Sequence, residues 1–282
     1  MTMFFWERIN YFRPAKLSLN GQLQWAAGKG NIKTAKEALA KGADPLCSGG
    51  QAFISAVLAD QVKVLQLMTS HLEKNDQRLD ATSLRTMFRS ACDHDSKNCA
   101  LFLISKGVDP NAQDGIDLRR ALHSGSVNTV TAVLDGYALS DKSHYELFKQ
   151  IMRGGRMIRS DVSQHKPVQP EEQAVTVRRE MLVDIANKLI DRGVKVHDWF
   201  DEPIKIAINR SGKRMRDMDD YRIKLIKSML MRDPDAASWP KDEIAKLPNA
   251  LINDLECGVL RETACKSGLK LAKDAKVKYD RM

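Results

Sequence analysis

The phrase Lys-Gly-apolar-Asp-Pro occurs twice in this chain of 282 residues, at Lys41–Pro45 and at Lys106–Pro110, 65 residues apart. The match extends upstream over twenty residues without a gap. The aligned pairs are Ala26 and Ala91, Leu39 and Ile104, Gly42 and Gly107, Asp44 and Asp109, and Pro45 and Pro110. An apolar spacing that recurs together with this ending indicates two copies of one structural unit.

Two further copies fit at offsets of 30 and 95 residues from the first. The second copy repeats the apolar pattern of the first at Ala56, Val57, Val62 and Leu65, and the fourth repeats it at Ala121, Gly125, Val127, Val130 and Leu134. The period is therefore about 30 to 35 residues, which is typical of a solenoid built from stacked repeats.

One unit predicts a pair of helices. Leu23, Ala26 and Ala27 lie on one face of a short first helix, and Gly30 ends it because glycine adopts left-handed backbone angles at little cost. A second helix follows over 32–40 with its own apolar face, and the Asp-Pro step forces the chain out of helical conformation. Neither helix can bury its apolar face alone, so each unit must stack on the next.

This pattern resembles the ankyrin repeat. KGVDPNAQDG at Lys106–Gly115 is similar to the turn between ankyrin repeats, and AAGKGN at Ala26–Asn31 is similar to the end of their first helix. The Thr-Pro-Leu-His opening of the family is missing from every unit, so the turns are expected to be irregular. The resemblance covers residues 18–136. It implies an all-α solenoid that binds another protein and needs no cofactor.

Weaker copies continue toward the C-terminus. LIDRGVKV at Leu189–Val196 repeats the ending of the earlier units, after a predicted helix over Tyr145–Met152. Segments Pro203–Gly212 and Tyr221–Asp235 predict one more pair of helices. The predicted organisation is an N-terminal aromatic capping helix over 1–17, four ankyrin-like repeats over 18–136, two divergent repeats over 137–239, and a C-terminal helical cap over 240–282.

Two arginine-rich inserts interrupt the divergent repeats, over 153–172 and 210–220. They align with each other and are expected to project from one edge of the stack. A paired site for an acidic protein surface is one interpretation, since guanidinium groups bind carboxylates and phosphates through two hydrogen bonds. Nucleic-acid or nucleotide binding through 153–166 and 210–216 is the alternative, and two solvated loops are the third. The candidate residues are Arg153, Arg156, Arg159, Arg210, Lys213, Arg214 and Arg216.

Aromatic residues are concentrated at the N-terminus, where Phe4, Phe5 and Trp6 are consecutive in a chain that is only 6% aromatic. The favoured interpretation is a helix that covers the exposed core of the first repeat. Contact of these three residues with a partner protein, or with a membrane surface, is the alternative.

Composition limits the function classes. The net charge of +9 favours acidic partners, and five cysteines without a CxxC motif indicate free thiols in a reducing, cytoplasmic compartment. Cys92, His94 and Cys99 do not have the spacing of a metal site, and no histidine lies in a nucleophile motif. No transmembrane segment is expected. The sequence therefore predicts a non-catalytic, protein-binding repeat protein without cofactor or metal, acting as an inhibitor or as a bacterial or viral effector in the host cytosol. Self-association stays open.

Overall fold

The computed structural model describes residues 17–153 and 169–194. The chain divides into two compact units, Met1–Ala138 and Leu139–Met282. All regular structure within the described residues is helical, and no strand is present among them. This confirms the predicted all-α fold class.

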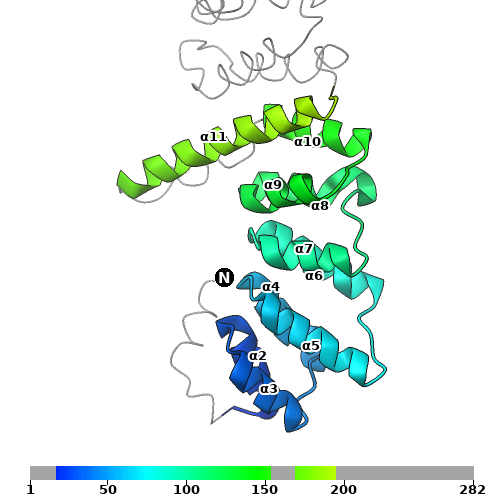
Figure 1. The fold of residues 1–282 in the computed structure, drawn as a ribbon. Coiled ribbons are helices and arrows are strands. Elements are labelled where there is room, and N and C mark those ends of the chain that lie inside the picture. Colours follow the sequence, from blue (N-terminus) through cyan, green and yellow to red (C-terminus); the bar gives the residue numbers. More distant parts are fainter. Residues whose placement is uncertain (1–16, 154–168, 195–282) are drawn as a thin grey trace, which may run out of the picture. The chain divides into compact units, whose positions relative to one another are not determined.

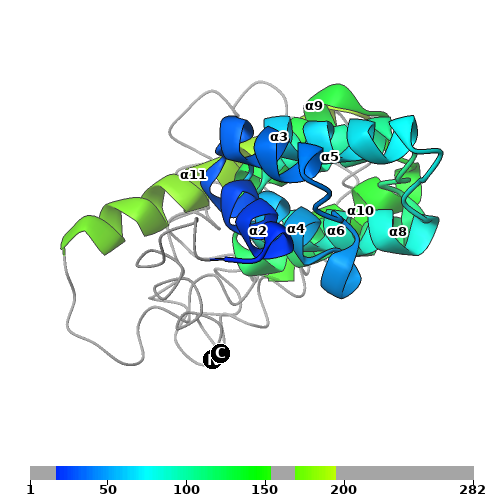
Figure 2. The same cartoon turned by 90° about the horizontal axis from the view of Figure 1, so that it is seen from below.

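The first unit is a stack of helix pairs (Figure 1). Each pair contains a first helix and a second helix that run against each other, and corresponding helices of successive pairs are in contact. Seen along the stack, the labelled first helices lie in one row and the labelled second helices in another (Figure 2). The pairs are α2 (Leu19–Lys29) with α3 (Ile32–Ala40), α4 (Cys47–Leu58) with α5 (Val62–Lys74), α6 (Ala81–Asp93) with α7 (Lys97–Ser105), and α8 (Ala112–Ser124) with α9 (Val127–Gly136).

Small side chains at one repeated position hold the stack together. Two consecutive residues of each first helix are almost completely buried, and at least one of the two is small in every pair. Small residues allow neighbouring helices to approach closely, so that the larger side chains around them can interlock. These residues are Ala26 and Ala27, Ala56 and Val57, Ala91 and Cys92, and Ala121 and Leu122.

A left-handed residue separates the two helices in every pair. Gly30 and Gly125 have φ values of 69° and 89°, as expected for glycine. The equivalent residues of the middle pairs are Asp60 and Asp95, with φ values of 51° and 56°. Aspartate tolerates this conformation better than most residues, but it carries a side chain that glycine lacks.

The side chains of these two aspartates connect each pair to the next. Asp60 accepts hydrogen bonds from the Cys99 N–H at 2.9 Å and from Asn98 Nδ2 at 2.7 Å, both at the start of α7. Asp95 accepts from the Thr129 N–H at 2.8 Å at the start of α9. Neither α7 nor α9 has a side-chain cap from its own N-cap residue. Each aspartate therefore satisfies N–H groups that the neighbouring helix leaves open.

The connections between pairs are irregular, as the missing family motif predicts. Asp44 accepts a hydrogen bond from the Leu46 N–H at 2.8 Å, and Asp109 accepts one from the Asn111 N–H at 2.9 Å. The connections before α4 and before α8 therefore begin with the same type of turn. Three consecutive left-handed residues follow in each case, before α4 and α8 take up right-handed helical geometry: Ser48, Gly49 and Gly50, and Gln113, Asp114 and Gly115. Such runs are costly for residues other than glycine.

The described part of the second unit contains α10 (Asp141–Arg153) and α11 (Gln169–Asp191), which contact each other. Leu147 and Phe148 are buried on α10, and Ile185 and Leu189 are buried on α11. Because α11 begins at Gln169, the last four residues of the predicted insert over 153–172 are helical, and the predicted end of that insert was wrong.

Replacing Asp60 tests whether its carboxylate holds the second and third pairs together. We expect Asp60→Ala to lower the free energy of unfolding by about 1–3 kcal/mol, since it removes a cap and places alanine at a left-handed position. Asp60→Gly removes the same cap without the backbone strain, so its loss should be smaller but clear in urea unfolding followed by circular dichroism. A glycine variant as stable as the wild type would contradict the capping role.

His144 predicts a pH dependence in the second unit. The side chain is buried, neither ring nitrogen has a hydrogen-bond partner, and burial lowers its pKa, with Arg192 adding to the effect and Asp141 opposing it. The unfolded chain therefore binds more protons as the pH falls below about 6.5, and stability decreases. We expect faster hydrogen exchange in α10 at pH 5.5 than at pH 7.5, after correction for the intrinsic rate. His144→Leu should reduce this difference, whereas His94→Gln, at an exposed site, should leave it intact.

Candidate functional site

The site residues predicted from sequence lie almost entirely outside the described residues. Arg153 is the last residue of α10, and its side chain is not among those described. Outside the described ranges lie Arg156, Arg159, Arg210, Lys213, Arg214 and Arg216, together with the aromatic residues Phe4, Phe5 and Trp6. The arginine-rich inserts and the aromatic helix therefore stay predictions.

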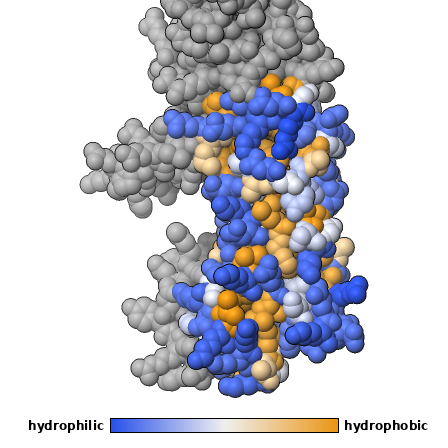
Figure 3. Space-filling view, viewed as in Figure 1, coloured by the Kyte–Doolittle hydropathy of each residue, from blue (hydrophilic) through white to orange (hydrophobic). Residues whose placement is uncertain are grey.

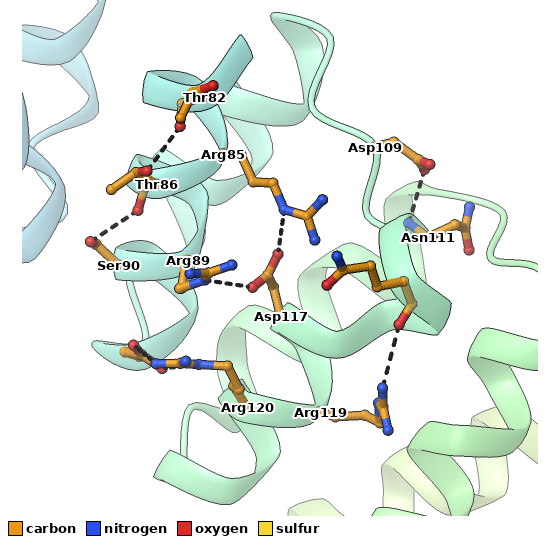
Figure 4. A network of polar contacts seen from close by, with 12 residues as sticks. Thr82, Arg85, Thr86, Arg89, Ser90, Asp109, Asn111, Asp117, Arg119 and Arg120 are labelled. Carbon is orange, nitrogen blue, oxygen red and sulfur yellow. Dashed lines mark hydrogen bonds and ion pairs between the residues drawn. The ribbon is translucent and has the colours of Figure 1, made fainter.

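The structure instead brings together an arginine cluster on two neighbouring first helices, defined as Arg85 and Arg89 of α6 with Arg119 and Arg120 of α8 (Figure 4). Arg85 and Arg89 are four residues apart and so lie on the same side of α6. Asp117 of α8 lies opposite both of them. The cluster exists only because the third and fourth pairs stack in register.

Asp117 is the centre of this arrangement, with a residue exposure of only 4%. Its Oδ1 accepts a hydrogen bond from Arg89 Nε at 3.1 Å. Its Oδ2 lies 3.5 Å from Arg85 Nε, an ion pair without a hydrogen bond. A single carboxylate is therefore shared by two guanidinium groups, whose side chains remain 32% and 44% exposed.

The other two arginines are held in different ways. Arg120 binds Asp93 of α6 through both Nη2, at 2.7 Å, and Nε, at 3.4 Å. This hydrogen bond raises the pKa of Arg120, so the guanidinium stays charged. Arg119 Nη2 donates to the backbone oxygen of Gln113 at 3.4 Å, which ties the helical part of α8 to the left-handed turn at its start.

Sequence reasoning missed this cluster, although one signal for it was present. Asp117 aligns with Ala52 and Met87 in the two preceding units, and both of those residues are buried. A charged residue at a core position requires a partner of opposite charge. When the repeats are aligned, the two arginines on the preceding first helix are the candidates for that partner. The contact joins residues 28 apart, so it becomes visible only once the stacking is known.

A groove of about 460 Å³ lies near the connection between α5 and α6. Leu72, Leu79 and Leu84 contribute apolar surface to it. Lys106 and Glu73 also line the groove and form an ion pair, with 2.7 Å between Nζ and Oε1. Asp76 and Arg78 add one charge of each sign. This balance of charges does not specify a class of ligand.

Two of the three cysteines in the described segments are packing residues. Cys92 and Cys99 are buried, and burial raises the pKa of both thiols far above the usual range, so they remain protonated. Within residues 17–153 and 169–194, no group of three or more His, Cys, Asp or Glu side chains is arranged to hold a metal ion. None of the described helices is long and apolar enough to cross a membrane.

The buried position of Asp117 predicts an unequal effect of two similar substitutions. We expect Asp117→Asn to lower the free energy of unfolding by about 1–3 kcal/mol, because it leaves two neighbouring guanidinium groups without their shared charge. Asp93→Asn weakens a more exposed ion pair and should cost less than about 1 kcal/mol. Urea unfolding of the two variants provides the comparison. Equal losses would show that burial of Asp117 adds nothing.

Comparison with known proteins supports the repeat assignment. A family model for ankyrin repeats, with three copies, matches residues 23–114. The matched segment begins in α2 and ends in the left-handed turn that opens α8. It covers 92 of the 282 residues and includes two of the four residues of the arginine cluster. No curated protein matches the chain.

Proposed function

Residues 23–114 are ankyrin repeats, which form protein–protein interaction domains, and we propose that this chain acts without catalysis by occupying the surface of a partner protein. Proteins built from such repeats are generally non-catalytic binding modules. The observation that carries the proposal is the continuous row of outward-facing residues on the first helices.

This row has a definite chemical order. At one register position the four first helices present Gln24, Ile54, Arg89 and Arg119, each at least partly exposed. One turn further along, Leu58 of α4 is also partly exposed. The surface therefore changes from polar and apolar in the first two pairs to cationic in the last two. A partner that covers the whole row meets both kinds of contact.

Apolar residues reach the surface of the first unit elsewhere as well. On the face seen in Figure 3, apolar residues (orange) lie in a broken band between hydrophilic ones (blue). Partly buried apolar groups with a polar surround are typical of protein interfaces. Helices that pack at roughly 8–10 Å give a row of four helices a span of about 24–30 Å, which is the scale of a standard interface.

The finer part of the proposal concerns what binding does. We infer that it blocks the partner, as an inhibitor or as a bacterial or viral effector in the host cytosol. Cys47, Cys92 and Cys99 form no disulfide within the described residues, and free thiols suit a cytoplasmic protein. The nucleic-acid alternative depends on the arginine-rich inserts, and the described residues offer no observation that favours it over protein binding.

Substitutions on α4 test the proposed face. Ile54→Arg combined with Leu58→Arg should abolish capture of a protein partner from native or host lysate, because two charges replace apolar contacts at the centre of the row. The matched control is Gln66→Arg with Ser70→Arg, which adds two charges with the same spacing to exposed positions of α5. Circular dichroism should show that both variants fold.

Three outcomes would contradict the proposal. Capture that survives the α4 substitutions would place the interface elsewhere. Equal loss in the α5 control would indicate a general effect of added charge. Loss of capture after nuclease treatment would favour the nucleic-acid alternative.

A further inference from the structure

We propose that the arginine cluster of α6 and α8 binds an acidic segment of the partner, in which carboxylate side chains follow apolar ones. This inference rests on the proposed function and deepens it by naming the chemistry of the partner. Four arginines on two adjacent first helices define the site: Arg85, Arg89, Arg119 and Arg120.

The contacts within the cluster leave it with surplus positive charge. Arg85, Arg89 and Arg120 share the two carboxylates of Asp117 and Asp93. Arg119 donates to a neutral backbone oxygen. Arg85, Arg89 and Arg120 therefore outnumber the carboxylates that they contact by one, and a negatively charged ligand balances this charge.

Asp117 restricts the positions of two of the arginine side chains. It contacts Arg85 and Arg89 through their Nε atoms, and it is almost fully buried while the arginine side chains are not. The forked Nη ends are the part of a guanidinium that binds a carboxylate through two hydrogen bonds. Holding Arg89 by Nε leaves its forked end for a ligand and reduces the side-chain entropy lost on binding.

Arg85 gives an independent reason to expect an anion. Its Nε and Nη2 atoms are shielded from solvent, and among the described residues neither has a hydrogen-bond acceptor, although Nε is ion-paired with Asp117. Charged donors without an acceptor carry a large desolvation penalty. Because these two atoms are shielded as the side chain lies, Arg85 must turn outward for a ligand carboxylate to supply the missing acceptor, and the gain then exceeds simple charge attraction.

The surroundings favour an acidic protein segment over a nucleic acid. On the side away from α8, the first helix next to α6 is α4, on which Ile54 and Leu58 are partly exposed. A phosphate backbone gains little from these apolar groups, whereas a peptide can place leucine or phenylalanine on them. The hydroxyl groups of Thr86 and Ser90 bond to backbone oxygens of their own helix, so they add no charge between the apolar and cationic parts.

A peptide titration with the full chain tests the proposal. The probe is a fluorescein-labelled peptide with two leucines followed by six glutamates, and the reference peptide carries glutamines in place of the glutamates. We expect fluorescence anisotropy to show at least tenfold tighter binding of the glutamate peptide at low salt. Arg89→Gln combined with Arg119→Gln should weaken that binding by at least tenfold.

The control variant removes the same charge from the opposite row of helices. Lys33→Gln combined with Lys36→Gln neutralises two exposed lysines of α3, so binding should change by less than about twofold. Arg89→Lys with Arg119→Lys keeps the charge but not the fork, and it should bind with intermediate affinity. Thermal melts of each variant keep loss of folding apart from loss of binding.

Several results would overturn the proposal: equal binding of the two peptides, an equal loss in the lysine control, or a 20-base-pair DNA duplex that binds more tightly than the glutamate peptide and depends on the same arginines. Failure of this inference is distinguishable from failure of the proposed function. If the arginine variants still capture the protein partner while the α4 variant does not, the first-helix face binds protein but the arginines do not select it.

Discussion

The structure of the first unit depends on close contact between successive helix pairs. A single pair has an apolar face that it cannot bury alone, and the next pair covers that face. Close packing between pairs is possible because each first helix has a buried alanine at the contact: Ala26, Ala56, Ala91 and Ala121. Because these contacts join neighbours only, stability adds up along the stack instead of arising from one central core. The turns, the caps and the outward rows of side chains all take their positions from this packing.

Much of this arrangement could be predicted from the sequence because its signals are local. Glycine at Gly30 and Gly125, the apolar spacing of each helix, and the Asp-Pro steps lie within one unit and act within one unit. The roles of Asp60 and Asp95 could not be predicted in the same way. Each looks like an ordinary turn residue, and its hydrogen bonds reach a helix more than thirty residues later. Such a contact can be predicted only once the alignment of successive helix pairs in the stack is known.

The difference between the middle and outer pairs follows from the same contacts. Glycine at the left-handed position removes strain but cannot link one pair to the next. Aspartate accepts some strain there and caps the following helix instead. At Gly30 an added Cβ would clash with the Gln61 side chain, so the first pair has no room for aspartate there unless that side chain moves. The left-handed turns that open α4 and α8 had only their glycines and the missing family motif as signals, since runs of three such residues are rare and depend on the fit between pairs.

Asp117 shows how a binding surface can be built without disturbing the stack. At its register position the neighbouring units place alanine or methionine, and either would serve the core at least as well as a buried carboxylate. Buried ion pairs are often no more stabilising than apolar residues of similar size. The charge has a consequence that an apolar residue could not have, because it orders two arginines at the surface from beneath. Stability alone does not account for such a residue, whereas the proposed presentation of guanidinium groups to an acidic ligand would.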